Sequence, residues 1–365
     1  MDFAVALATS TESWRPVVRA EALGFRRAWF YDTQLLNPDV FVGMALAAER
    51  TERIRLGTGV LIPSNRIAPV AANGFATLNR LAPGRIDFGV GTGFTGRRTM
   101  GMGAIRLADL ERYVLEVRGL LAGKTVDAVI EGAPRRMRFL NPELGLIHLD
   151  DPVPLHVSAM GPKSRRSAAR LGGGWLNFTG SDAGGLRDLE DWRDACVEAG
   201  RDPDAAEATL FLLGAVLAPG EGFDSPRAVA QAGPYVAVML HNLVETSEAG
   251  SLHGHVPDFL ADAVEAYRKV HAGYDPEAPW LENHRGHLMF LREEECALMT
   301  PELIRHFTFT DTRDRLVERL GALGEAGYGE IAVQLVHGHE HAIEDWAQVA
   351  AGLDAPGAER TVDPR

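Results

Sequence analysis

Short apolar runs alternate with longer segments of helical periodicity along most of the chain. The segment 107–121 shows the clearest helical spacing, because its apolar residues recur at intervals of three and four. The alternation predicts strands at 3–8, 28–31, 54–62, 85–90, 155–159, 175–178, 209–217 and 330–336. Nearly every strand is followed by a predicted helix, and this order favours right-handed crossovers and a parallel α/β sheet.

Eight such units in 365 residues favour a closed (β/α)8 TIM barrel over an open sheet. Two insertions interrupt the rhythm. A hairpin excursion is expected within 125–152, after the fourth strand, and a mostly helical insertion over 225–306 follows the seventh. No linker divides the chain, so we expect one domain over 1–353 and a polar tail over 354–365.

Composition narrows the possible partners. The net charge of −13 argues against binding to nucleic acid or to an anionic membrane, since both require basic patches. The two cysteines, Cys196 and Cys296, have no paired spacing, so neither a disulfide framework nor a cysteine zinc site is expected. The first residues resemble no signal peptide and no apolar run is long enough for a membrane span, so we expect a soluble cytoplasmic protein.

The stretch Gly91–Gly96 fits the pattern G-x-G-x-x-G. A dinucleotide-binding fingerprint belongs to the first βα unit and opens directly into a helix. These glycines instead follow the fourth strand, and residues 96–105 have no helical pattern. We therefore interpret Gly91, Thr92 and Gly93 as a loop that lets the backbone approach a flat ligand closely, with a simple glycine turn as the alternative.

Three blocks resemble the luciferase-like flavin-dependent oxidoreductases, a superfamily that includes bacterial luciferase and the reductases that use the deazaflavin F420. The blocks are ALGFRRAWFYD (22–32), AAERTERIRLGTGVLIPSNRIAPVAANGFATLNRLAPGRIDFGVGTG (47–93) and DPVPLHVSAMGPKSRRSAARLGGGWLNFTG (151–180), and a weaker one is LGEAGYGEIAVQLVHG (323–338). The resemblance implies a barrel that holds reduced F420 or FMN at its strand ends. Within this superfamily, the chain most resembles the methylene-tetrahydromethanopterin reductase-like branch.

The same resemblance implies the cofactor contacts. A non-prolyl cis peptide often follows the third strand in this family, which by position falls near Gly59-Val60. The fifth and sixth strand ends would face the phosphate side, with Lys163, Arg165 and Arg166 either adding charge or forming a solvated helical turn. The expected cofactor-binding residues are Thr58, Gly59, Val60, Gly91, Thr92, Gly93, Ala159, Met160, Gly161, Thr179, Gly180 and Ser181.

The second strand departs from the family pattern. Members usually end it with a carboxylate followed by His, whereas this chain has Asp32, Thr33 and Gln34. Asp32 is expected to hydrogen-bond the cofactor ring or to position a substrate; the alternative is the N-cap of the next helix. Thr33 and Gln34 supply neutral donors and acceptors in place of the missing His.

Other candidates lie on loops and in the insertion. His337 opens the run HGHEH (337–341) after the last strand, and we expect it to line the active site as an acid or base rather than to bind a metal. Asn65, Arg97 and His241 are candidate substrate contacts, although Arg97 also suits a solvated loop and His241 a buried core position. No metal site is expected.

These observations favour an enzyme that acts on a small molecule. We expect hydride transfer with F420, with Asp32 and His337 handling protons. One alternative is an FMN-dependent monooxygenase supplied by a separate flavin reductase, and another is a flavin-binding relative without activity. A nicotinamide-dependent Rossmann enzyme rests only on the glycine motif. The resemblance also suggests a homodimer.

Overall fold

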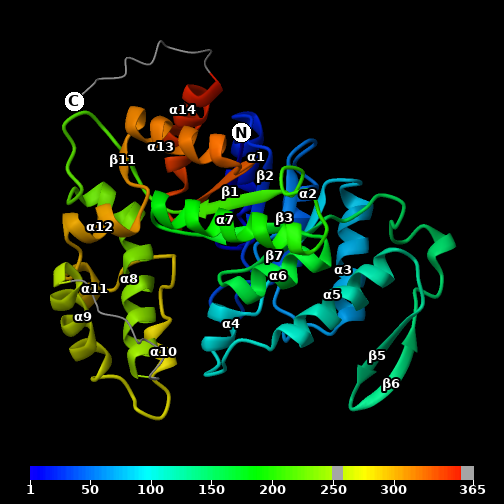
Figure 1. The fold of residues 1–365 in the computed structure, drawn as a ribbon. Helices are drawn as coiled ribbons and strands as arrows, with labels where there is room; N and C mark the ends of the chain where they lie inside the picture. The colour runs from blue at the N-terminus through cyan, green and yellow to red at the C-terminus, as the bar shows by residue number, and fades with distance from the viewer. Residues whose placement is uncertain (249–257, 355–365) are drawn as a thin grey trace.

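The computed structural model describes residues 1–248 and 258–354 and contains a closed barrel of parallel strands (Figure 1). The strands lie around the barrel in chain order, and the last pairs with the first through the register Asp2 to Glu330. They are β1 (Asp2–Leu7), β2 (Arg27–Phe30), β3 (Arg55–Thr58), β4 (Ile86–Val90), β7 (Leu155–Ser158), β8 (Gly174–Phe178), β9 (Ala208–Leu212) and β12 (Glu330–Leu335). This arrangement confirms the expected (β/α)8 fold.

Helices cover the outside of the barrel. Their apolar faces bury large side chains such as Phe75, Trp192 and Trp346 against the strands. The helices are α1 (Trp14–Ala22), α2 (Val40–Ala48), α3 (Ala68–Leu81), α5 (Leu107–Leu121), α6 (Pro162–Leu171), α7 (Asp182–Glu198), α13 (Arg313–Ala326) and α14 (Ile343–Asp354). None of the described helices is long and apolar enough to cross a membrane.

Two local predictions are wrong. The segment 209–217 is not one strand, because β9 ends at Leu212 and β10 (Val216–Leu217) pairs instead with β11 (Asp311–Thr312) in a separate sheet. This segment leaves the barrel wall and lies against residues 309–310. The approach is so close that a side chain at Gly214 would overlap the backbone of Phe309. The stretch after Gly93 is not entirely a loop, since α4 (Phe94–Arg98) forms one short helix there.

Both interruptions of the rhythm form structure of their own. An antiparallel hairpin, β5 (Val126–Ile130) and β6 (Ala133–Met137), precedes the short turn η1 (Pro142–Leu144) and projects away from the barrel (Figure 1). The second insertion has its own apolar core, built around side chains such as Leu240 and Tyr267. Its helices are α8 (Pro226–Glu248), α9 (Asp258–His271), α10 (Trp280–Asn283), α11 (Glu293–Cys296) and α12 (Pro301–Phe307). Of the predicted tail 354–365, all but Asp354 lies outside the described residues.

A buried network of charges fills the amino-terminal end of the barrel. Arg27 donates to Asp87 at 3.0 Å and to Glu330 at 2.9 Å, and Arg55 donates to Asp87 at 2.8 Å. Burial alone would raise the pKa of Asp87, but the charge of Arg27 and hydrogen bonds from His156 and Arg55 outweigh it and lower that pKa. Because active sites in such barrels lie at the opposite end, we assign this network to stability.

Candidate cofactor and active site

The carboxyl ends of the strands form the mouth of the barrel, where enzymes of this fold bind their ligands. Alternate residues of each strand point inward, so the interior near the mouth receives Tyr31 from the end of β2 and Phe178 from β8. Val60 follows β3 and packs on the same apolar cluster. Met289 of the helical insertion also packs there, and the insertion therefore covers part of the mouth.

Glycines form one wall of this mouth. A Cβ on Gly91 would lie 2.8 Å from Val60 Cγ2 and 3.3 Å from Ser158 Cβ, so any side chain would fill the space beside them. The peptide bond between Gly59 and Val60 is cis, at the position that the family resemblance implied. Gly93 has a φ of 80° and is the N-cap of α4. This bare backbone fits the close approach of a flat ring.

Gln334 is a candidate that sequence reasoning missed. Its Oε1 accepts a hydrogen bond of 3.2 Å from the Tyr31 hydroxyl, and both side chains are buried. Its Nε2 is buried without a partner among residues 1–248 and 258–354. Such an amide is costly unless a ligand or water accepts from it. The signal was present in the strand EIAVQL, where the two-residue period points Glu330, Ala332 and Gln334 inward.

Asp32 is engaged within the protein. Its carboxylate accepts from Arg66 Nη1 at 2.8 Å and from the amide N–H of Ile62 at 3.2 Å. Burial raises the pKa of Asp32, although the charge and hydrogen bonds of Arg66 oppose the shift. The alternative interpretation as a helix cap is wrong, because Asp39 caps α2. Asp32 therefore ties the β2 loop to the loop after β3.

The neighbouring candidates extend this network. Asn65 donates to Gln34 Oε1 at 2.7 Å, and Gln34 in turn donates to the carbonyl of Gly96. Three loops are thus joined beside the glycine wall. Thr33, which lies between Asp32 and Gln34 in the sequence, is half-buried. Arg97 of α4 donates to the carbonyl of Gly103, in the loop that follows this helix, at 2.5 Å.

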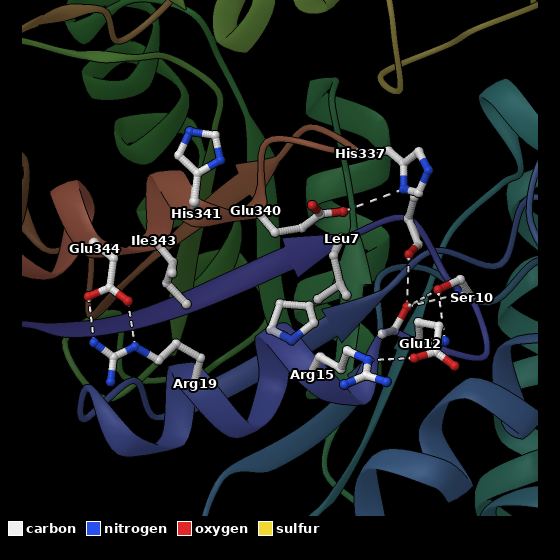
Figure 2. Close-up of a pocket in the computed structure, with 13 residues that line it drawn as sticks. Leu7, Ser10, Glu12, Arg15, Arg19, His337, Glu340, His341, Ile343 and Glu344 are labelled. Carbon is white, nitrogen blue, oxygen red and sulfur yellow. Dashed lines mark hydrogen bonds and ion pairs between the residues drawn. The ribbon is translucent and has the colours of Figure 1, made fainter.

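His337 lies outside the barrel mouth. The inward positions of β12 and its extension are even-numbered, whereas His337 lines a pocket between β1, α1 and the turn η2 (Glu340–Ala342) (Figure 2). Its Nδ1 lies 3.4 Å from Glu340. Arg19 and Glu344 form an ion pair across the same pocket. Its predicted catalytic role stays a prediction, and the placement on the outer face gives it no support.

The ends of β7 and β8 carry the residues expected at the phosphate side. Gly161 and Ser181 are the N-caps of α6 and α7. Of the three basic candidates nearby, Arg165 is buried and paired with Asp188 and Asp191. A further set of residues forms a shallow pocket at the start of α7, and it comprises Gly180, Ser181, Asp182, Ala183, Glu302, Arg305, His306 and Arg319. The remaining phosphate-side candidates are Ala159, whose carbonyl accepts from Trp175, the exposed Met160, and Thr179.

His241 lies in the core of the insertion. It is 2% exposed and its Nε2 lies 2.7 Å from Glu295. The insertion is joined to the loop after β4, because Arg98 of α4 donates to Asn242 at 2.9 Å and to Glu245 at 2.7 Å. The chain segments near His241 therefore border the mouth.

A parallel (β/α)8 barrel with a glycine-lined mouth and a covering insertion has the architecture of a ligand-binding barrel enzyme. The chain belongs to the luciferase-like monooxygenase family, whose sequence profile matches residues 8–330. It is 36% identical to an F420-dependent glucose-6-phosphate dehydrogenase of Beutenbergia cavernae over 186 residues, which are 48% of this chain and 52% of that protein. It is 26% identical to a 5,10-methylenetetrahydromethanopterin reductase of Archaeoglobus fulgidus over 320 residues, which are 86% of each chain.

Two solved structures share the fold. The F420-dependent tetrahydromethanopterin reductase of Methanopyrus kandleri matches with a TM-score of 0.68 and 18% identity, over 95% of this chain and 97% of that one. The oxygenating component of 3,6-diketocamphane monooxygenase of Pseudomonas putida, in complex with FMN, matches with a TM-score of 0.65 and 15% identity over 98% of each chain. The chain spans about half the length of the F420-dependent dehydrogenases it matches. The names of the family and of these relatives are those of oxidoreductases and monooxygenases.

Proposed function

We propose that this chain is an F420-dependent oxidoreductase that transfers a hydride between the deazaflavin and a small organic substrate. The observation that carries the proposal is the bare backbone at Gly91, beside Val60 and Ser158, which suits a flat ring. The choice of F420 over FMN rests on the relatives at about a third identity, which are named for F420. Barrel and insertion would act as one catalytic domain over 1–353.

The residues of the mouth would bind and orient the ring. Gly91 and Val60 would hold one face, and the unpartnered amide of Gln334 would donate to a ring or substrate oxygen. Tyr31 fixes the orientation of that amide through its hydroxyl. Met289, from the insertion, would help to exclude water from the mouth. The bound deazaflavin would supply the hydride chemistry itself.

Anaerobic titration tests the choice of cofactor. The purified chain would be titrated with F420 and, separately, with FMN, and binding followed by cofactor fluorescence. We expect saturable F420 binding in the micromolar range, equivalent to about −8 kcal/mol, and weaker FMN binding. Tight FMN binding without F420 binding would instead support an FMN-dependent monooxygenase. Binding of F420 without turnover across a panel of alcohols, sugar phosphates and pterins would support a non-catalytic relative, which Thr33 in place of His also favours.

Gln334 gives a test of the binding site. We expect Gln334→Met to weaken cofactor binding about tenfold, since it removes one buried hydrogen-bond donor worth about 1–1.5 kcal/mol. Tyr31→Phe is the comparison variant, because it removes the hydroxyl that orients the amide but leaves the amide in place, and it should weaken binding less than Gln334→Met. An unchanged affinity in Gln334→Met would place the ring elsewhere.

A further inference from the structure

Three histidines from separate parts of the sequence meet inside the helical insertion. His241 lies on α8, while His284 and His287 follow α10. One ring nitrogen of each lies within 4.8 Å of those of the other two. His241 and His284 are only 2% and 3% exposed, and His287 is half-buried. Such a convergence of imidazoles is unusual for an apolar core, because polar rings are buried less often than apolar side chains.

Each ring is held from one side. His241 Nε2 lies 2.7 Å from Glu295, while His284 Nε2 lies 3.3 Å from a Glu245 oxygen in a close contact that lacks hydrogen-bond geometry. His287 Nε2 lies 3.1 Å from Thr95 Oγ1. This is the pattern of metal-binding histidines, in which a carboxylate or another oxygen engages the nitrogen that faces away from the ion and fixes the orientation of the ring.

The other nitrogen of each ring is left without a partner. The Nδ1 atoms of His241, His284 and His287 are all buried and make no hydrogen bond within the described parts of the chain, 1–248 and 258–354. An unpaired buried polar atom costs about 1–3 kcal/mol, so three in one place call for a ligand.

We propose that His241, His284 and His287 bind one divalent transition-metal ion of the zinc type. Imidazole nitrogens suit zinc, at bond lengths of about 2.0–2.1 Å, so small rotations of the three side chains would bring them onto one ion. Three protein ligands leave a coordination position for water, as in open zinc sites. The proposal goes beyond the function proposed above and does not depend on it.

The position of the site gives the ion a role in the fold. His287 contacts Thr95 of α4, and Glu245 behind His284 is paired with Arg98 of the same helix. Met289, two residues after His287, packs on the interior of the barrel. An ion held by the three histidines would therefore fix the segment over the mouth to α8 and to the loop after β4.

Metal analysis of the full chain, prepared without a polyhistidine tag, tests the proposal. The protein would be stripped with a chelator, equilibrated with ZnCl2, dialysed and analysed by mass spectrometry of the metal. We expect about one zinc per chain and an increase in melting temperature, since a ligand of the native state stabilises it. CoCl2 should give the ligand-field absorption of a nitrogen-ligated, low-coordinate cobalt ion. A stoichiometry near zero for both metals would overturn the proposal.

Variants locate the site. His284→Gln combined with His287→Gln should weaken zinc binding at least tenfold while circular dichroism stays native. The matched control is His339→Gln with His341→Gln, which alters the same residue type in the loop after β12 and should bind zinc like the parent chain. If the double variant in the insertion does not fold, His287→Gln alone gives the same readout at a half-buried position. Binding that follows His339 and His341, or that survives both insertion variants, overturns the proposal.

Discussion

The carboxylate of Asp32 is paired with groups of the protein itself. Arg66 and the amide N–H of Ile62 take up its oxygens, and Asn65 lies 3.4 Å from one of them. The sequence showed an acid at a strand end, where catalytic groups gather in barrels. It could not show that a guanidinium 34 residues later would reach the same carboxylate. At this position the structure favours a residue that fixes loops around the mouth.

This interpretation makes a prediction for both partners. Removing either side of a buried ion pair leaves a charge unpaired, so Asp32→Asn and Arg66→Gln should each lower the free energy of unfolding by about 3 kcal/mol. Their effects should not add in the double variant, because the two residues share one interaction. Urea denaturation measures all three values. The two single variants should also lose cofactor affinity to the same extent, and a larger loss in Asp32→Asn alone would mean that Asp32 contacts the cofactor directly.

At the scale of elements, the period of apolar residues predicted most of the barrel. The helix at Leu107–Leu121 was located to the residue, because its apolar spacing is a local signal. The short helix α4 gave no such signal, since five residues cannot display a period. The histidine cluster could not be predicted from the sequence either. His284 follows His241 by 43 positions in the chain, and the fold of the insertion brings both together with His287.

Two glycines expected at strand ends differ in what surrounds them. A Cβ on Gly180 would overlap the backbone carbonyl of Phe307, at the end of α12, whereas a Cβ on Gly161 meets nothing within 4 Å. We therefore expect Gly180→Ala to destabilise the protein by about 1–3 kcal/mol, because the backbone of α12 has to move. Gly161→Ala should cost less than about 1 kcal/mol, the usual penalty at an N-cap. Thermal denaturation of the two variants compares them. Equal losses would show that α12 is not held against β8 in solution.

At the scale of the whole molecule, the two ends of the barrel differ in how their polar groups are paired. The amino-terminal end holds charges that are paired with one another, and the carboxyl end holds a bare backbone and an unpartnered amide. A buried polar atom without a partner costs stability, so the amide of Gln334 at the carboxyl end is a place where a bound ligand would be stabilised. The polar residues of one sequence thus fall into two classes, which only their partners in space distinguish.

The paired end predicts how stability depends on pH. Because the folded state lowers the pKa of Asp87, its ionised form stabilises the protein at any pH above the ordinary aspartate value of about 3.9, and this contribution is lost as the pH falls through the lower folded value. Asp87→Asn should lower the free energy of unfolding at pH 7 by about 3–5 kcal/mol, since Arg27 and Arg55 lose their shared partner. The variant should also lose part of the acid dependence, most of it as the pH falls below about 4.

Urea denaturation across that pH range measures both effects. Asp127→Asn is the matched control, because Asp127 pairs with Arg136 on the exposed hairpin with both side chains more than three-quarters exposed. Exposed pairs contribute at most about 1 kcal/mol, so the control should retain nearly all the stability and the acid dependence of the parent chain. If Asp87→Asn retained them as well, the network at the amino-terminal end would not contribute to the stability of the protein.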